Sequence, residues 1–311
     1  MTTALLTHPD CLGHLVPPGH PERPERLKAV TEVLAADSFA PLLRIPAPLA
    51  HEEAVLRAHP RIYLDILKAE IPASGFVALD ADTHVSPGSI EAALRALGAV
   101  LRGVDMVMGA EVTNAFAAVR PPGHHAEENR AMGFCLFSNV AIAAKYALDH
   151  HGLSRVAVID FDVHHGNGTQ AILWDEPRAL FVSTHQMPLW PFTGSPDEKG
   201  AHDNVLNVPL PPRSDGERFR GEVEGRVLPR LQAFAPELVL VSAGFDAHTA
   251  DPLAQLHLRE DDFAWVTERL CDIADAHCGG RLVSTLEGGY DLDALAACVA
   301  AHVKVLMERG V

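Results

Sequence analysis

Short apolar runs that are hydrophobic on both alternating phases recur along the chain. They occupy residues 114–119, 155–159, 179–184, 238–242 and 281–286. A strand that is buried on both faces has this pattern, because helices cover both sides of a parallel sheet. The five segments are therefore predicted to be strands of a parallel sheet.

Most of the segments between these runs have apolar residues at the spacing of an amphipathic helix. Predicted helices cover residues 89–104, 139–151, 219–234, 261–277 and 292–307. Strands that alternate with helices indicate βαβ units. Proline-rich pieces at 17–24, 41–48, 188–196 and 209–212 are interpreted as loops. No repeat or linker divides the sequence, so we expect one domain over residues 1–311.

Composition narrows the class of protein. Hydrophobic residues make up 48% and charged residues 21% of the 311, which is typical of a globular chain. The 41 acidic and 25 basic residues leave a net charge of −16, which argues against nucleic acid as a partner and favours cationic ones. Neither a signal peptide nor an apolar run of about 18 residues is present, so we expect a soluble cytoplasmic protein without membrane contact. The five cysteines form no C-x-x-C pair, which disfavours disulfides and a zinc finger.

The 18 histidines are an unusual number, and position must decide which of them matter. Ligands of open parallel sheets bind beyond the carboxyl ends of the strands. Four of the predicted strands are followed there by chemically active sequences, namely RPPGHH, DFDVHHGNG, AGFDAH and EGGY. These sequences bring aspartates, histidines and a tyrosine to one rim.

Asp162, His164 and Asp246 are the candidate metal ligands on this rim. Two carboxylates and an imidazole from neighbouring strands make a three-ligand site with open positions, as in catalytic zinc sites. The alternative is that both aspartates cap the loops and helices that follow them.

The tandem His124-His125 follows a rigid Pro-Pro-Gly turn. Two adjacent imidazoles do not both remain cationic, so their neighbours must separate their pKa values, with Asp160 and Asn167 as candidate partners. A neutral imidazole here can take a proton from water and return it to a leaving group. Tyr290, after Gly-Gly, can donate a hydrogen bond to an oxyanion. A helix cap or packed turn is the alternative for the histidines, and loop closure for the tyrosine.

At these residues the sequence resembles the zinc-dependent histone deacetylase family, within the arginase/deacetylase fold. The shared motifs are HPERPERL, RPPGHHA, GFCLFSNVA, DFDVHHGNGT, SAGFDAH and LEGGYD, in family order from His20 to Asp291. The PPGHHA spelling and Asn167 resemble the class II branch and its bacterial relatives, which include acetylpolyamine amidohydrolases.

The resemblance implies one three-layer α/β/α domain with a mostly parallel, eight-stranded sheet. It implies one catalytic Zn²⁺ on Asp162, His164 and Asp246, with His125 as general base and acid. His124, backed by Asp160, would be an electrostatic partner or an alternate acid, and Asn167 would lie behind His125. Tyr290 would polarise the acetyl carbonyl.

The resemblance also implies a substrate tunnel and a second ion. The tunnel residues would be Gly133, Phe134, Trp190 and Leu253, and a structural K⁺ would be bound by Asp160, Asp162, His164 and Ser183. Polyamine-specific relatives of the eukaryotic type have a glutamate where this chain has Leu253. The expected substrate is therefore an acetyl-lysine side chain or a related acyl amine, with acetylpolyamines and other small N-acyl amines as the alternative.

Two other functions are alternatives to this NAD-independent amidohydrolase, and each makes a different demand on the sequence. An arginase-like ureohydrolase needs a second carboxylate-rich metal set, which the sequence does not supply. A catalytically silent protein that binds acetylated ligands has no need of the metal triad, the histidine pair and Tyr290. The sequence leaves the oligomeric state open, a homo-oligomer included.

Overall fold

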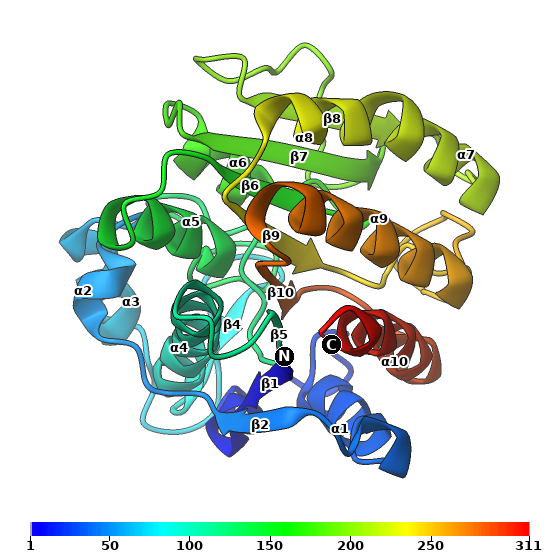
Figure 1. Ribbon diagram of the computed structural model, residues 1–311. Helices are drawn as coiled ribbons and strands as arrows, with labels where there is room; N and C mark the ends of the chain where they lie inside the picture. The colour runs from blue at the N-terminus through cyan, green and yellow to red at the C-terminus, as the bar shows by residue number, and fades with distance from the viewer. Residues whose placement is uncertain (1, 311) are drawn as a thin grey trace.

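The computed structural model describes residues 2–310, and eight parallel strands form its main sheet (Figure 1). The strand order is β2-β1-β5-β10-β9-β6-β7-β8. The strands are β1 (Thr3–Thr7), β2 (Leu43–Pro46), β5 (Asn114–Ala117), β6 (Val156–Asp160), β7 (Ala179–Gln186), β8 (Val205–Leu210), β9 (Leu238–Ala243) and β10 (Leu282–Leu286). Every pairing within this sheet is parallel.

Helices cover both faces of the sheet, which confirms the predicted α/β fold. In Figure 1, α4 and α5 lie on one side of the strands, and α1, α9 and α10 lie on the other. The helices are α1 (Pro24–Val33), α2 (Glu52–Val55), α3 (Arg61–Ala69), α4 (Ser89–Met108), α5 (Asn139–His150), α6 (Asn167–Leu173), α7 (Gly216–Glu222), α8 (Leu228–Phe234), α9 (Glu260–Cys278) and α10 (Leu292–Arg309).

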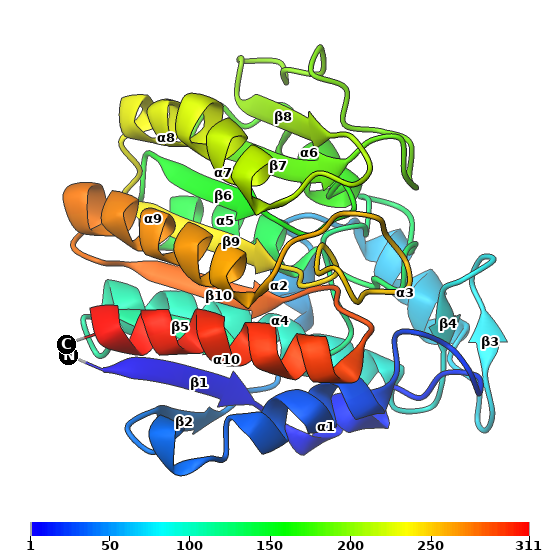
Figure 2. The ribbon, with the colours of Figure 1, turned by 90° about the vertical axis from the view of Figure 1, so that its right-hand side faces the viewer.

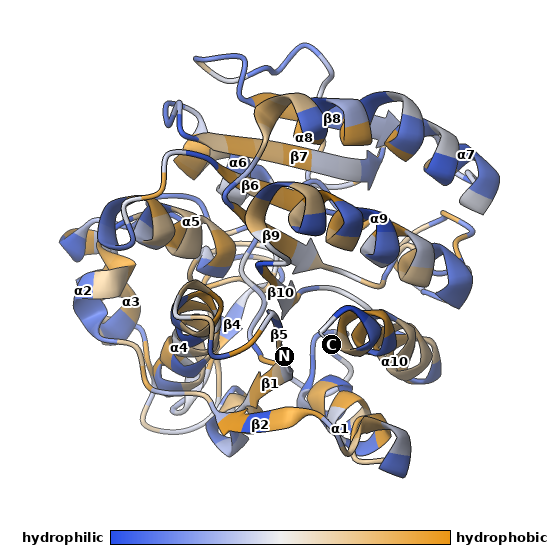
Figure 3. Cartoon of the chain, viewed as in Figure 1, coloured by the Kyte–Doolittle hydropathy of each residue, from blue (hydrophilic) through white to orange (hydrophobic). Residues whose placement is uncertain are grey.

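The strands form where the sequence is apolar on both phases, because both faces are covered. Every residue of β5, β6, β7, β9 and β10 is buried. Figure 3 shows hydrophobic residues along β7 and alternating hydrophobic and hydrophilic stripes on the flanking helices. The five strands predicted from these runs are confirmed, and each predicted end lies within two residues of the observed end.

Two sequence-based expectations need correction. Two pieces interpreted as loops contain strand residues, since 41–48 includes the edge strand β2 and 209–212 begins with the last two residues of β8. Pro46 and Pro209 are tolerated because β2 and β8 are the edge strands of the sheet, and an edge strand leaves one row of N–H groups unpaired. The helix predicted over 219–234 consists of α7 and α8 joined by a π-helical turn at Val223–Val227. The sequence reading also missed β1, β8 and a small antiparallel pair, β3 (Val77–Ala78) with β4 (His84–Val85).

The strands all point toward the same edge of the sheet, because the sheet is parallel throughout. Figure 2 shows the arrowheads directed at the side where long loops and the β3–β4 hairpin gather. The chemically active sequences that follow the strands therefore meet at this edge.

Candidate active site

Four neighbouring strands in the middle of the sheet supply the candidate groups. The order β5-β10-β9-β6 places the segments that follow these strands next to one another. His124 and His125 follow β5, Asp162 and His164 follow β6, and Asp246 follows β9. The order of the strands in the sheet, and not proximity in the sequence, therefore brings these residues together.

The candidate metal ligands are buried and face one another. The Nδ1 atom of His164 lies 3.2 Å from Oδ1 of Asp162 and 3.0 Å from Oδ2 of Asp246. One ligand atom from each residue lies within 4.8 Å of the others. Two anionic oxygens and one imidazole nitrogen at this separation fit a divalent cation between them, and nitrogen with oxygen ligands suits zinc.

Backbone amides hold the carboxylates in place. Gly288 N–H donates to Oδ2 of Asp162 at 2.8 Å, and Val163 N–H donates to Oδ1 of Asp246 at 2.9 Å. A Cβ atom on Gly288 would lie only 2.1 Å from Oδ2 of Asp246. Glycine is therefore required at 288, because the backbone approaches both carboxylates closely.

The triad retains protons when no cation is bound. Burial, followed by the charge of Asp162, raises the pKa of Asp246 to about 7. Burial opposes the charged form of His164, but its hydrogen bonds to Asp162 and Asp246 outweigh burial and raise its pKa to about 10. A metal ion must displace these protons, so metal affinity at this site rises with pH.

The two adjacent histidines have different partners. Nδ1 of His124 donates to Oδ2 of Asp160 at 2.9 Å, and Nδ1 of His125 donates to Oδ1 of Asn167 at 2.8 Å. Asn167 in turn donates from Nδ2 to Oε1 of Glu127 at 2.8 Å, which fixes the orientation of its amide. His125 is therefore the Nδ1-protonated tautomer when it is neutral, and its Nε2 carries a lone pair.

These partners drive the pKa values of the two histidines apart. Burial, then the charges of His124 and His164, lowers the pKa of His125 well below its usual range. Burial also disfavours the cation at His124, but Asp160 and Asp162 outweigh it and raise the pKa of His124 well above that range. The surroundings of the pair thus favour the cation at His124 and the neutral base at His125.

Glu287 contributes a contact that the sequence analysis did not assign. Its Oε2 accepts hydrogen bonds from the backbone N–H groups of Gly123 at 2.7 Å and His124 at 3.2 Å, and its Oε1 accepts one from Ser242 Oγ at 3.0 Å. It ties the histidine turn to the ends of β9 and β10. Burial raises its pKa to about 7. The sequence did contain an indication of this role, because Glu287 directly follows a buried strand, just as Asp162 and Asp246 come soon after buried strands.

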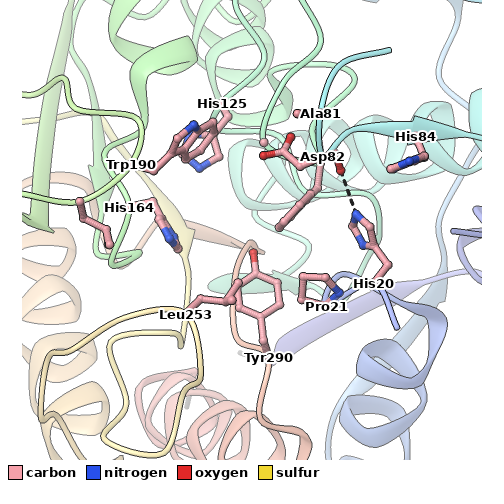
Figure 4. A pocket seen from close by; sticks show the side chains of 13 residues that line it. His20, Pro21, Ala81, Asp82, His84, His125, His164, Trp190, Leu253 and Tyr290 are labelled. Carbon is pink, nitrogen blue, oxygen red and sulfur yellow. Dashed lines mark hydrogen bonds between the residues drawn. The ribbon is translucent and has the colours of Figure 1, made fainter. Parts of the chain in front are cut away.

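A cavity of about 360 Å³ opens above these groups (Figure 4). His125 and His164 line it from one side and Tyr290 from another, with the phenol oxygen pointing into the cavity. Its walls contain all of the predicted tunnel residues, namely Gly133, Phe134, Trp190 and Leu253. The Phe134 ring meets the Tyr290 ring edge-on at 5.9 Å, and the Trp190 ring meets His125 edge-on at 4.7 Å.

Gly133 lies in the cavity wall where the structure leaves no room for a side chain. Its φ of +56° favours glycine, and a Cβ atom there would lie 2.5 Å from the His125 ring and 2.6 Å from the Trp190 ring. A side chain at 133 would therefore collide with the rings of His125 and Trp190, both of which line the cavity.

The rim of the cavity includes polar residues that sequence reasoning did not single out. They are His20, Asp82 and His84. Nε2 of His20 donates to the carbonyl oxygen of Asp82 at 2.8 Å, the contact drawn in Figure 4. Asp251, also unassigned, accepts a hydrogen bond from the backbone N–H of Tyr290 at 2.7 Å.

A buried ion network supports the loops of the site from behind. Glu22 binds Arg26 at 3.1 Å and Arg120 at 2.7 Å, and all three side chains are fully buried. Arg26 also donates from Nε to the carbonyl oxygen of Gly289 at 2.6 Å, and its guanidinium lies 4.9 Å from the centre of the Tyr290 ring. The network thus connects the loop of Tyr290 to the start of the histidine turn.

Ser183, predicted as a potassium ligand, lies beside Asp160. The two residues are paired in register across β6 and β7, and Ser183 is fully buried. The Ser183 hydroxyl is within 2.9 Å of Nδ1 of His185. The structure therefore places two of the four predicted potassium ligands, Asp160 and Ser183, side by side on neighbouring strands.

Comparison with known proteins agrees with this arrangement. The histone deacetylase domain profile matches residues 20–306. The chain belongs to the histone deacetylase family. It is 44% identical to an uncharacterized protein of Synechocystis over 98% of this chain and 99% of that one. It is 40% identical to the histone deacetylase-like amidohydrolase of Pseudomonas aeruginosa, over 94% of this chain and 79% of that one.

A solved structure extends the family match to three dimensions. The crystal structure of the HDA15 HD domain superposes with a TM-score of 0.93 at 34% identity, covering 99% of this chain and 88% of that one. The family match confirms the predicted resemblance and the prediction of a hydrolytic enzyme of the deacetylase and amidohydrolase type. Within residues 2–310, no helix has the length and hydrophobicity that crossing a membrane demands.

Proposed function

We propose that this family member is a zinc-dependent deacetylase that hydrolyses the amide of acetyl-lysine side chains or closely related acyl amines. The observation that carries the proposal is the buried triad of Asp162, His164 and Asp246 beside an apolar cavity into which His125 and Tyr290 also project. In this proposal residues 1–311 act as one catalytic unit in the cytoplasm.

The triad would hold the metal ion. When bound, Zn²⁺ polarises a carbonyl group and makes water more acidic. Asp162 and Asp246 keep their orientation through the N–H groups of Gly288 and Val163, so the carboxylates need little rearrangement on metal binding. Such fixed ligand orientation is how surrounding groups tune a metal site.

His125 would move the proton. It is neutral at neutral pH, and its Nε2 lone pair is free because Nδ1 is engaged with Asn167. It accepts the proton of the attacking water and delivers it to the departing amine. His124 stays cationic beside Asp160 and adds positive charge behind the reacting carbonyl.

Tyr290 would stabilise the developing oxyanion. Burial, then the charge of Asp246, raises the pKa of its phenol well above the usual range, so the hydroxyl keeps its proton. Arg26 against the ring and Asp251 on the backbone amide hold the residue in place. A fixed donor at the oxyanion position commonly contributes a factor of about 10²–10³ to kcat.

The cavity walls would select the substrate. Phe134 and Trp190 line an apolar part of the cavity that suits the methylene chain of an acylated lysine, and Leu253 adds an apolar side chain to the same wall. We also propose a structural K⁺ at Asp160, Asp162, His164 and Ser183, supported by the pairing of Asp160 with Ser183.

The test replaces Tyr290 by Phe and follows turnover of a fluorogenic acetyl-lysine peptide. We expect kcat to fall by about 10²–10³-fold with metal content and melting temperature unchanged. Near-normal turnover in Tyr290→Phe would refute the role of the phenol. A parallel kcat/KM panel includes acetyl-lysine peptides, acetylputrescine and acetylspermidine, and higher values for the free polyamines would refute the substrate class.

A further inference from the structure

A second cluster of metal-ligating side chains lies at the opposite edge of the sheet from the active site. Asp105 is in the last turn of α4, His150 is the last residue of α5, and His151 follows it. Both helices precede strands of the parallel sheet, β5 and β6, so their C-terminal ends lie near the amino ends of the strands. The candidate active site lies at the carboxyl ends.

The three side chains converge on one point. Nε2 of His151 lies 2.9 Å from Oδ1 of Asp105. One ligand atom from each of Asp105, His150 and His151 lies within 4.8 Å of the other two. The two imidazole rings are perpendicular, with centres 5.0 Å apart. Two adjacent histidines thus present nitrogens to one carboxylate from two directions.

Tyr146 orients two members of the cluster. Its hydroxyl donates to Oδ1 of Asp105 at 2.9 Å, and its ring stacks on His150 with centres 4.7 Å apart and planes at 13°. Hydrogen bonds and packing around ligands are a regular feature of metal sites, because they reduce the freedom that binding must remove. The imidazole of His150 makes no hydrogen bond to another residue among 2–310, so its ring nitrogens remain available.

The surrounding charges favour a cation. The free carbonyls at the C-terminus of α5 place partial negative charge beside His150 and His151. Arg57 lies with its guanidinium 5.3 Å from the centre of the Tyr146 ring, and it forms an ion pair with Asp149 at 3.2 Å, which offsets its positive charge. Among residues 2–310, no arginine or lysine forms an ion pair with Asp105.

We propose that Asp105, His150 and His151 bind a divalent transition-metal ion, with zinc as its representative. Two imidazoles and a carboxylate suit Zn²⁺, Ni²⁺ or Cu²⁺, whereas Mg²⁺ and Ca²⁺ need shells of oxygen. The remaining coordination positions face solvent, because His150 is exposed and the other two are half-buried. The ion joins the C-terminal end of α4 to that of α5 and is independent of the active-site ion.

The experiment counts zinc in the untagged full-length protein after equilibration with zinc and a weak chelator. We expect His150→Ala and His151→Ala to contain one equivalent of zinc less than wild type, with circular dichroism unchanged. Asp105→Asn should bind zinc more weakly. The experiment compares the zinc content of each variant with that of wild type, so the expected difference is the same whether or not the active site contains zinc. Removing the active-site ligand with Asp246→Ala should leave the second equivalent in place.

His202→Ala is the matched control. His202 also pairs with an aspartate, Asp175, at 2.8 Å, but it belongs to no three-ligand group among residues 2–310. This variant should keep the zinc content of wild type. Equal zinc content in wild type and His150→Ala overturns the proposal, and so does an equal loss in His202→Ala, which would indicate unspecific histidine binding. His150 is exposed, so its replacement leaves folding intact and the result readable.

Discussion

Replacing Glu22 by Gln tests the buried ion network directly. The change keeps the shape of the side chain and removes the one carboxylate that faces both Arg26 and Arg120. Two buried guanidinium groups then lose their shared counter-charge. Removing one partner of a buried ion pair typically costs about 3–5 kcal/mol, because the remaining charge stays desolvated.

The structure gives a second route to this magnitude. Burial by itself raises the pKa of Glu22, but Arg120 and Arg26 outweigh burial and hold the pKa at about 2, against 4.5 in the unfolded chain. This difference corresponds to about 3 kcal/mol of stability at pH 7, at about 1.4 kcal/mol per pH unit. Glu22 is fully buried, so solvent screening does not reduce the figure.

The pH dependence of the loss has a definite sign. A carboxyl group with a depressed folded-state pKa stabilises the protein above the unfolded pKa of 4.5, and this contribution is lost as the pH falls through 2. The difference between wild type and Glu22→Gln should therefore be constant from pH 7 to about 5. It should shrink by about 1 kcal/mol by pH 4.

Urea unfolding followed by circular dichroism measures the loss. Glu52→Gln is the matched control, since Glu52 also pairs with two cations, Arg61 at 2.9 Å and Lys68 at 2.6 Å, but at the surface. That exposed pairing should contribute only about 0–1 kcal/mol. A loss in Glu22→Gln no larger than in Glu52→Gln would refute the reasoning.

Three further predictions concern the metal triad, the thiols and the buried histidines. Gly288→Ala should weaken zinc binding at least about tenfold in a chelator competition, because the added Cβ atom would displace Asp246. Gly221→Ala is the control and should bind zinc as wild type does, because a Cβ atom at 221 meets no described atom within 4 Å. All five thiols are free and buried, with pKa values raised by burial, so Ellman's reagent should label none in the native protein and five after denaturation. Burial lowers the pKa of His59 to about 4 in the folded protein. Below pH 6.5 the unfolded chain therefore binds a proton at this residue that the folded protein does not bind, and the stability decreases as the pH is lowered. His59→Gln should remove about 1 kcal/mol of the stability decrease between pH 7.5 and 5.5, and an unchanged decrease would contradict this.

The sequence predicted five of the strands that are buried on both faces, and with them the residues that follow each strand, but it did not predict β1, although the first four residues of β1 are buried as well. It did not predict β2, because a short edge strand is exposed and carries prolines that indicate loops. Asp162, His164 and Asp246 were identifiable because parallel strands place their ends at one edge. Glu22 and Arg26 were not, since their burial depends on contacts with Arg120 and Gly289, far away in the sequence.

Two polar residues of the cavity wall could not be predicted from the sequence for a similar reason. Asp82 and His84 reach the cavity from a short hairpin whose position depends on loop packing and not on strand register. The cluster of Asp105, His150 and His151 was equally invisible, because only the packing of α4 on α5 brings the three residues together.

The distribution of the metal ligands over two strands has a consequence for biosynthesis. Asp162 and His164 follow β6, whereas Asp246 follows β9, which lies in the last third of the chain and pairs directly with β6. A nascent chain has no complete triad until β9 has left the ribosome and joined the sheet. Metal capture is therefore a late event, and the bound ion reports that the central strands have assembled.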